Sequence, residues 1–216
     1  MPIYRALLCD LDGTLADSEP LHCDAWLTVL AENYNLHFDE HWFEQFIGTH
    51  DETVADQVVA NHDIGVTARE LVGEKKALFH RKVRSSATSF PRVPALLARI
   101  SADFPVAIAT NSNREDAELM VEGLGFGAYA KVLVTATDVA HRKPAPDIFA
   151  TAARELGVPA GQCIAIEDSG PGAESARAAG CYVIGLTERA AAAADELIED
   201  QARALERAER LLRASE

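Results

Sequence analysis

The fold is decided near the start of the 216-residue chain by the stretch Ala6-Leu7-Leu8-Cys9-Asp10-Leu11-Asp12-Gly13-Thr14. The apolar run at 4–9 predicts a strand that is covered on both faces. Two carboxylates, Asp10 and Asp12, follow it directly. Because open α/β sheets bind ligands at the carboxyl ends of their strands, this position favours a functional site. The alternative interpretation is an ordinary acidic turn in which Gly13 supplies a positive φ.

Four later segments repeat the apolar pattern, and helical patterns lie between them. The expected strands are 106–109, 132–134, 163–166 and 182–186, and the expected helices are 95–100, 115–124, 146–156 and 173–179. This alternation of strand and helix predicts an α/β protein with a parallel sheet.

Residues 18–86 interrupt the alternation, because they carry helical spacing and no convincing strand. Leu21, Ala25 and Val29, for example, recur at every fourth position. Polar segments at 14–17 and 85–90 flank this region and are candidate hinges. We therefore expect two domains, a core of residues 1–16 and 88–216 and a helical domain of residues 17–87.

Near the C-terminus, Ile198, Leu205 and Leu212 recur every seven residues and form an apolar stripe. The stripe is shorter than the three to four heptads of a coiled coil, so a helix packed on its own core is favoured over a dimer seam. We expect a monomer or a weak homodimer. The alanine run at 190–194 has high helix propensity.

Composition argues against several classes of partner. The chain has 34 acidic and 20 basic side chains, and its net charge of −14 would repel a nucleic-acid backbone. The apolar runs are far shorter than the roughly 20 residues of a membrane-spanning helix, so no membrane partner is expected. The 4 cysteines include no Cys-x-x-Cys pair, which disfavours a zinc site and a secreted disulfide framework. These features favour a cytoplasmic protein.

Polar groups also follow the later strands. The candidates are Thr110 and Asn111 after 106–109, Lys143 after 132–134, and Glu167 and Asp168 after 163–166. Taken singly, Thr110 fits a helix cap and Lys143 a solvated lysine. Together with the two acids of the first strand, they converge on one crevice, where a magnesium ion would relieve the repulsion between carboxylates.

These motifs resemble, in order, the four motifs of the haloacid dehalogenase-like hydrolase superfamily. The matching stretches are Asp10-x-Asp12-Gly13-Thr14, Thr110-Asn111, Lys143-Pro144 and Glu167-Asp168-Ser169. The helical insertion is similar to the small cap of the subclass that contains β-phosphoglucomutase and phosphoglycolate phosphatase. The resemblance covers nearly the whole chain and implies a Rossmann-like parallel-sheet core with an all-helical cap inserted after the first strand.

The resemblance also implies roles for the acids. Asp10 would be the nucleophile that forms an aspartyl-phosphate, and Asp12 would act first as general acid and then as general base. Magnesium (Mg²⁺) would be bound by the carboxylates of Asp10 and Asp168 and by the backbone carbonyl of Asp12, with Glu167 supporting the site from behind.

Three further residues would hold the phosphoryl oxygens, namely Thr110, Asn111 through its amide, and Lys143. Asp12 disfavours two other activities of this superfamily. Haloalkanoate dehalogenases and phosphonoacetaldehyde hydrolases carry a non-acidic residue at that position, because neither protonates a phosphate-ester leaving group.

Two features of the insertion bear on the cap. His22 matches the histidine that couples cap closure to the acid/base aspartate in β-phosphoglucomutase-like proteins, and a solvated helix histidine is the alternative. The cations Lys75, Lys76 and Arg81 lie in a polar helical run and are expected to form a solvated face.

The loop Gly48-Thr49-His50-Asp51 matches the substrate-specificity loop of the cap. β-Phosphoglucomutase has an arginine for its second phosphate at the position of Asp51, so the resemblance disfavours a bisphosphate substrate here. His50 and Asp51 are expected to bond substrate hydroxyls instead.

We therefore expect a Mg²⁺-dependent phosphatase of a small phosphorylated metabolite, a sugar or polyol phosphate. The alternative enzyme is a β-phosphoglucomutase-like phosphosugar mutase. A non-catalytic receiver-like phospho-acceptor module is the alternative from another class, although receivers are about half this length and lack a helical insertion.

Overall fold

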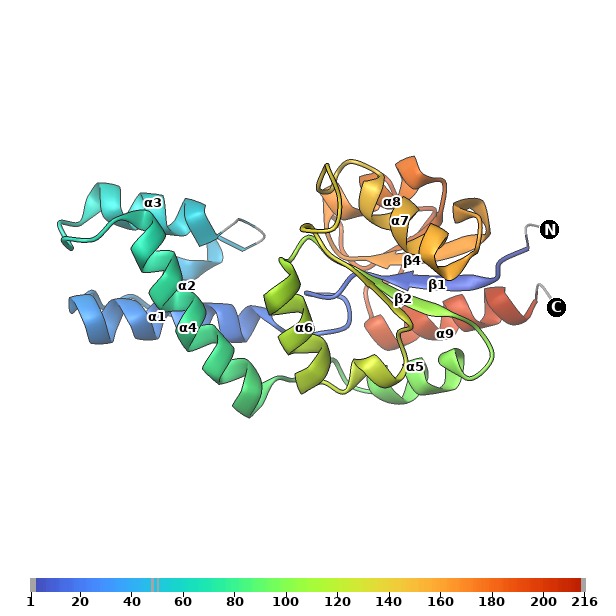
Figure 1. Ribbon diagram of the computed structural model, residues 1–216, viewed down its shortest axis with the longest axis horizontal. Coiled ribbons are helices and arrows are strands. Elements are labelled where there is room, and N and C mark those ends of the chain that lie inside the picture. Colours follow the sequence, from blue (N-terminus) through green and yellow to red (C-terminus); the bar gives the residue numbers. More distant parts are fainter. Residues whose placement is uncertain (1–2, 48, 50, 215–216) are drawn as a thin grey trace. The chain divides into compact units, whose positions relative to one another are not determined.

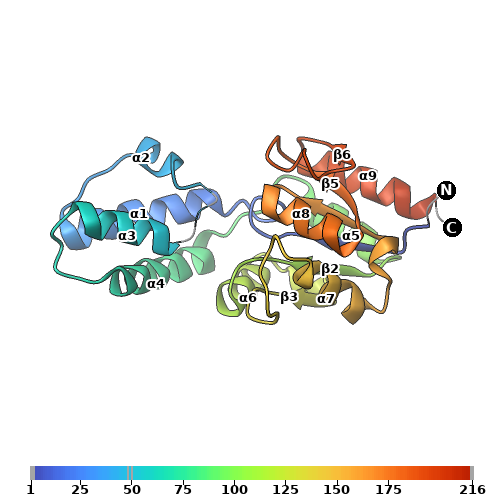
Figure 2. The ribbon, with the colours of Figure 1, turned by 90° about the horizontal axis from the view of Figure 1, so that it is seen from above.

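The computed structural model describes residues 3–47, 49 and 51–214. The chain divides into two compact units, which Figures 1 and 2 show as ribbons. The core unit comprises Met1–Asp17 and Thr88–Glu216, and the helical unit comprises Ser18–Ala87. Among the described residues, no helix combines the length and the apolar character needed to span a bilayer.

A parallel sheet with strand order β3-β2-β1-β4-β5-β6 forms the centre of the core unit. The strands are β1 (Ala6–Cys9), β2 (Val106–Ala109), β3 (Val132–Val134), β4 (Cys163–Glu167), β5 (Tyr182–Gly185) and β6 (Glu196–Leu197). The predicted α/β fold is confirmed, and so are its five predicted strands. The two-residue β6 was missed because it has no apolar run.

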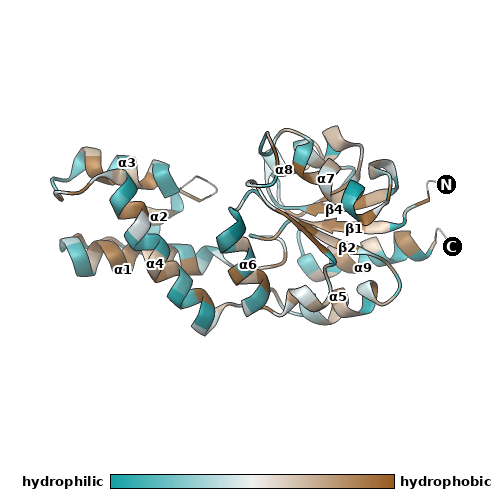
Figure 3. Ribbon diagram, in the orientation of Figure 1, coloured by the Kyte–Doolittle hydropathy of each residue, from teal (hydrophilic) through white to brown (hydrophobic). Residues whose placement is uncertain are grey.

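Helices cover both faces of the sheet, and the strands between them are hydrophobic (Figure 3). Helices α7 (Asp147–Leu156) and α8 (Gly170–Ala179) lie on one face, and α5 (Val93–Ser101) and α9 (Gln201–Arg213) lie on the other (Figure 1). Helix α6 (Arg114–Gly123) follows β2, and two short 3-10 helices, η1 (Phe126–Ala128) and η2 (Ala160–Gln162), precede β3 and β4. The side chains of β1, β2 and β4 are buried throughout, which explains their continuous apolar runs.

The C-terminal stripe packs within the core unit. Leu205 and Leu212 of α9 are buried, and α9 packs against α5, so the interpretation of a helix on its own core holds. Ile198 lies before the helix, which begins at Gln201.

The alanine run at 190–194 forms turns instead of the helix that its composition favours. The Asp195 carboxylate accepts a hydrogen bond from the Val183 amide, which ties the end of the run to β5. Ala190 and Ala194 pack so closely over Gly185 that a Cβ there would come within 3.0–3.1 Å of their methyl groups. Tertiary packing therefore outweighs local propensity in this segment.

The helical unit contains α1 (Glu19–Tyr34), α2 (Glu40–Glu44), α3 (Asp51–Asn61) and α4 (Ala68–Ser86). No strand occurs among its described residues. Asn35 ends α1 in the left-handed conformation, and Thr67 starts α4 through a capping box with Glu70. Trp26, Phe43 and Phe46 are buried together in the centre of the unit.

The topology brings the ends of the central strands together. β1 has β2 on one side and β4 on the other, and all three run parallel. The chain therefore reverses its winding direction beside β1, where open α/β sheets bind ligands. Asp10, Thr110 and Asp168 each follow one of these strands directly.

Candidate active site

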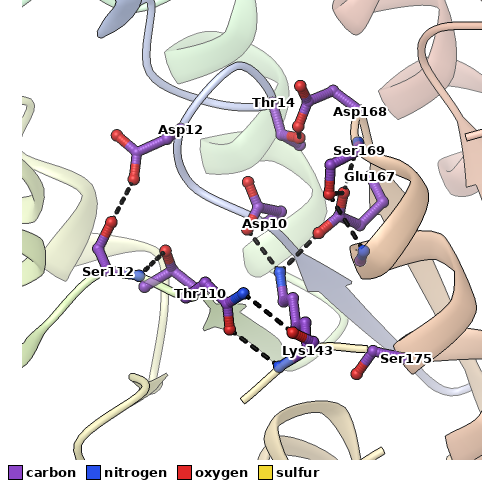
Figure 4. A network of polar contacts seen from close by, with 12 residues as sticks. Asp10, Asp12, Thr14, Thr110, Ser112, Lys143, Glu167, Asp168, Ser169 and Ser175 are labelled. Carbon is purple, nitrogen blue, oxygen red and sulfur yellow. Dashed lines mark hydrogen bonds and ion pairs between the residues drawn. The ribbon is translucent and has the colours of Figure 1, made fainter. Parts of the chain in front are cut away.

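Lys143 joins the ends of β1 and β4. Its Nζ donates to Asp10 Oδ1 and to Glu167 Oε1, each at 2.6 Å (Figure 4). All three residues are buried, and Nζ also lies 4.8 Å from the centre of the Phe149 ring. Burial alone would lower the pKa of Lys143, but the carboxylates of Asp10 and Glu167 outweigh burial and raise it. Lys143 is therefore a fixed buried cation.

Asp168 adds a third carboxylate to this cluster. One carboxylate oxygen from each of Asp10, Glu167 and Asp168 lies within 4.8 Å of the others. Burial raises the pKa of Asp10 well above its usual range; Lys143 opposes this shift, and Glu167 and Asp168 reinforce it. Burial and then Glu167 raise the pKa of Asp168 to about 7, against the opposing charges of Arg189 and Lys143. Negative charge is in excess here.

This donor set fits a hard divalent cation. Mg²⁺ prefers carboxylate and carbonyl oxygens, and the three converging carboxylates supply such oxygens. A divalent cation would also neutralise the charge that Lys143 leaves unbalanced.

Glu167 is held from two directions. Its Oε2 accepts hydrogen bonds from the Ser169 amide at 2.8 Å and from the Ser169 hydroxyl at 2.9 Å, while Oε1 accepts from Lys143. The hydroxyl of Ser169 in turn caps α8 by accepting from the Gly172 amide. A Cβ on Gly172 would lie 1.7 Å from Glu167 Oε1, so only glycine leaves room for this carboxylate.

Thr110 and Asn111 lie at the end of β2. The Thr110 hydroxyl oxygen accepts from the Ser112 amide at 3.0 Å, and its side chain is buried. The Asn111 side chain ties this loop to Lys143, accepting from the Lys143 amide at 3.0 Å and donating to its carbonyl at 3.4 Å. The predicted site residues after β1, β2 and β3 therefore lie together at one edge of the sheet.

Asp12 has a different partner from the other acids. It follows β1 in a tight turn in which Gly13 takes φ +78° and its amide donates to the Ala16 carbonyl. Its Oδ2 accepts from the Ser112 hydroxyl at 2.7 Å, and Figure 4 shows its side chain directed toward Ser112 and away from Asp10.

The helical unit holds a second polar cluster around Lys75. Lys75 Nζ lies 2.7 Å from both carboxylate oxygens of Asp51 and 2.8 Å from His22 Nδ1. Trp26 Nε1 also donates to Asp51, and the His22 ring stacks on Phe79 with centroids 4.2 Å apart. Burial would raise the pKa of Asp51, but the charge and hydrogen bonds of Lys75, together with His22 and Trp26, lower it.

The expectation of a solvated face is wrong for Lys75, whose side chain is 1% exposed. It belongs to a buried stripe of α4 whose members recur every four residues and therefore lie on the same face of the helix, namely Leu71, Lys75, Phe79 and Val83. In the segment predicted to be the specificity loop, the Thr49 hydroxyl donates to the Phe46 carbonyl at 2.7 Å. Gly48 and His50 lie outside the described residues.

A comparison with known families bears on this site. The sequence model of haloacid dehalogenase-like hydrolases matches residues 4–180. The chain belongs to this family.

The sequences of named haloacid dehalogenase-like hydrolases match this chain over most of their length. Fructose-1-phosphate phosphatase YqaB of Escherichia coli is 32% identical, over 82% of this chain and 93% of its own. Validoxylamine A 7'-phosphate phosphatase of Streptomyces hygroscopicus is also 32% identical, over 92% of this chain and 94% of its own. The crystal structure of CbbY from Rhodobacter sphaeroides in complex with phosphate superimposes on this chain with a TM-score of 0.76 and a sequence identity of 26%. The match covers 94% of this chain and 100% of that one.

Sequence reasoning assigned no role to several residues that contact the site, including three whose side chains lie beside the acids. Ser112 bonds Asp12, Ser169 bonds Glu167, and the Arg189 guanidinium lies 3.6 Å from Asp168. Ser112 and Ser169 lie within two residues of a predicted site residue, so their position in the motifs was a usable signal. Arg189 lies in the loop after β5, which no motif marked.

Proposed function

We propose that this haloacid dehalogenase-like hydrolase is a Mg²⁺-dependent phosphatase of small sugar or polyol monophosphates, acting through a phosphoryl group on Asp10. Phosphoric monoester hydrolysis follows from its family and from its named phosphatase relatives. The single observation that carries the site assignment is the buried Asp10 carboxylate, which is held by Lys143 inside an acidic cluster at the carboxyl edge of the sheet.

Asp10 is the proposed nucleophile. One of its carboxylate oxygens attacks phosphorus, a new P–O bond forms, and the bond from phosphorus to the leaving oxygen breaks. Lys143 supports this step because it fixes the carboxylate at 2.6 Å and places a buried cation beside the phosphoryl oxygens.

Asp12 is the proposed acid and base. It gives its proton to the leaving oxygen as the first step proceeds and becomes a carboxylate. In the second step, water attacks phosphorus, the bond to Asp10 breaks, and Asp12 takes the water proton. Phosphate leaves, and both aspartates return to their initial states.

Thr110, the amide of Asn111 and Lys143 are the proposed phosphoryl-binding groups. Because the Thr110 hydroxyl oxygen accepts from the Ser112 amide, its single proton is available to a phosphoryl oxygen. The side chain of Asn111 accepts from the Lys143 amide, which holds the loop after β2 and the loop after β3 together and keeps the three phosphoryl-binding groups close to one another.

The Asp10 and Asp168 carboxylates and the Asp12 carbonyl are the proposed Mg²⁺ ligands, and Glu167 supports them through Lys143 and Ser169. When bound, the ion supplies positive charge that offsets the repulsion between phosphate and carboxylates.

The helical unit is proposed to select the substrate as a cap, with His22, Gly48, Thr49, His50 and Asp51 as the candidate residues. Asp51 pairs with Lys75, so the charge of Lys75 is already compensated and is not available to a second phosphate. The names of the two phosphatase relatives each specify a single phosphate, in one case on a sugar. Cytoplasmic location and a monomeric or weakly dimeric state stay predictions from the sequence.

Phosphate release from a panel of monophosphates of sugars, polyols, glycolate and nucleotides, together with hexose bisphosphates, tests this function. We expect release from a small class of sugar or polyol monophosphates with Mg²⁺ and none with chelator. Asp10→Asn should be inactive, while Asp103→Asn, which removes an exposed carboxylate of the core unit, should remain active. A preference for bisphosphates would favour the mutase. Phosphorylation by acetyl phosphate without ester hydrolysis would favour a receiver-like module.

A further inference from the structure

Ser112 is connected to Asp12 across two loops of the core unit. Its hydroxyl donates to Asp12 Oδ2 at 2.7 Å, although the two residues are 100 positions apart in the chain. Ser112 follows the end of β2 by three positions, and Asp12 follows the end of β1 by three. Both side chains are half-buried, and Figure 4 shows them directed toward each other.

The Ser112 hydroxyl is carried by a fixed backbone. The Ser112 amide donates to Thr110 Oγ1 at 3.0 Å, and the Ser112 carbonyl accepts from the Ala136 amide at 3.1 Å. The Thr110 amide is itself bonded to the Val134 carbonyl at 2.9 Å. This loop is therefore anchored to the end of β3 at two points, and it holds the hydroxyl in place.

We propose that Ser112 is a positioning residue that fixes the rotamer of Asp12 for proton transfer; the inference rests on the proposed function of Asp12 as acid and base. An aspartate at a half-buried turn has several staggered rotamers available. A hydrogen bond biases such a population by up to about tenfold when the acceptor is neutral, and by more when it is charged. Ser112 therefore selects the one rotamer in which Oδ2 faces β2.

The bond also distinguishes the two oxygens of Asp12. A serine hydroxyl has one proton, and Ser112 gives it to Oδ2. Oδ1 is thereby left free of this bond, and we assign to it the delivery of the proton to the leaving group.

This role predicts a dependence on the leaving group. An alkoxide that departs from a polyol phosphate needs a proton from Asp12, whereas p-nitrophenolate departs without one. Loss of the Ser112 hydroxyl should therefore slow the alkyl ester more than the aryl ester. A general disturbance of the site would slow both to the same degree.

The test compares kcat and KM of Ser112→Ala on p-nitrophenyl phosphate and on a polyol phosphate that the unaltered protein hydrolyses. We expect kcat/KM, which reports the transfer to Asp10 and not the later hydrolysis, to fall about tenfold more for the polyol phosphate than for the aryl ester. Ser112→Thr, which retains a hydroxyl, should restore the ratio of the two rates. Ser101→Ala removes a hydroxyl that bonds only its own helix in the described structure, and it should leave the ratio unchanged.

Equal loss of kcat/KM on the two esters, or an unaltered kcat/KM on the polyol phosphate, would overturn the role of Ser112. If Ser112→Ala does not fold, Ser112→Cys provides the same comparison, because a thiol is a much weaker donor. A different result would show that the proposed function, and not the role of Ser112, is wrong. If the unaltered protein hydrolyses neither ester, Asp12 has no acid role for Ser112 to support.

Discussion

Lys143 Nζ lies 2.6 Å from Asp10 Oδ1, and both side chains are buried at the edge of the sheet. The ion pair joins the loop after β3 to the end of β1 and brings the proposed nucleophile next to the cation that we propose binds the phosphoryl group. Because Glu167 shares the same ammonium group at 2.6 Å, one lysine compensates two buried carboxylates.

Replacing Lys143 by Met should destabilise the core unit. The change leaves Asp10 and Glu167 buried without their cation, and breaking a buried pair in this way costs about 3–5 kcal/mol. Thermal unfolding followed by circular dichroism measures the effect. Mg²⁺ should raise the midpoint of Lys143→Met more than that of the unaltered protein, because the variant has more charge to neutralise. Lys131→Met, at an exposed position, is the control. Equal midpoints for the two variants would contradict the interpretation.

Replacing Gly172 by Ala should displace Glu167. The new Cβ would lie 1.7 Å from Oε1, so the carboxylate must move and lose its bonds to Lys143 and Ser169. We expect a loss of about 1–3 kcal/mol in the free energy of unfolding, as for other overpacked sites, and weaker Mg²⁺ binding by calorimetry. Gly127→Ala has its nearest described neighbour at 3.9 Å and should change neither quantity. Unchanged Mg²⁺ affinity in Gly172→Ala would argue against Glu167 as a support of the metal site.

Replacing Asp51 by Asn should destabilise the helical unit by about 3 kcal/mol near neutral pH, because Lys75 stays buried without its charge partner. Both tryptophans, Trp26 and Trp42, are in this unit, so urea unfolding followed by tryptophan fluorescence reports on it directly. Asp24→Asn removes the exposed partner of Lys82 and should cost under about 1 kcal/mol.

The contribution of Asp51 to the stability of the helical unit should depend on pH. The folded-state pKa of Asp51 lies below its usual value of 3.8, so its contribution is fully present above that value and is lost as pH falls through the folded pKa. The difference in stability between the unaltered protein and Asp51→Asn should therefore be constant from about pH 7 to about pH 5 and shrink below about pH 4. A difference that grows on acidification would contradict the direction of the shift.

Much of the fold was predictable because its physical signals are local. Strands buried on both faces need continuous apolar runs, and β2 and β3 have the bounds that these runs predict. The convergence of Asp10, Thr110 and Asp168 also follows from sequence, since parallel strands end at the same edge of a sheet. The short β6 and the alanine run depend on packing against β5, which no local pattern records.

Side-chain partners were harder to predict. The bond between Ser112 and Asp12 depends on rotamers and on two loops far apart in sequence. Lys75 and Asp51 are 24 positions apart on different helices, so their pairing needs the packing of α3 against α4. The burial of Lys75 alone could have been found, since it continues the inward stripe of Leu71 and Phe79.

The most direct test of the account is to locate the phosphoryl group on the protein. Asp12→Ala, treated with Mg²⁺ and p-nitrophenyl phosphate, whose leaving group needs no proton, then quenched and mapped by peptide mass spectrometry, should accumulate a phosphoryl group on Asp10, because water is no longer activated to remove it. The double variant with Asp10→Asn should carry none. A phosphoryl group on another side chain, or full turnover by Asp10→Asn alone, would contradict the account.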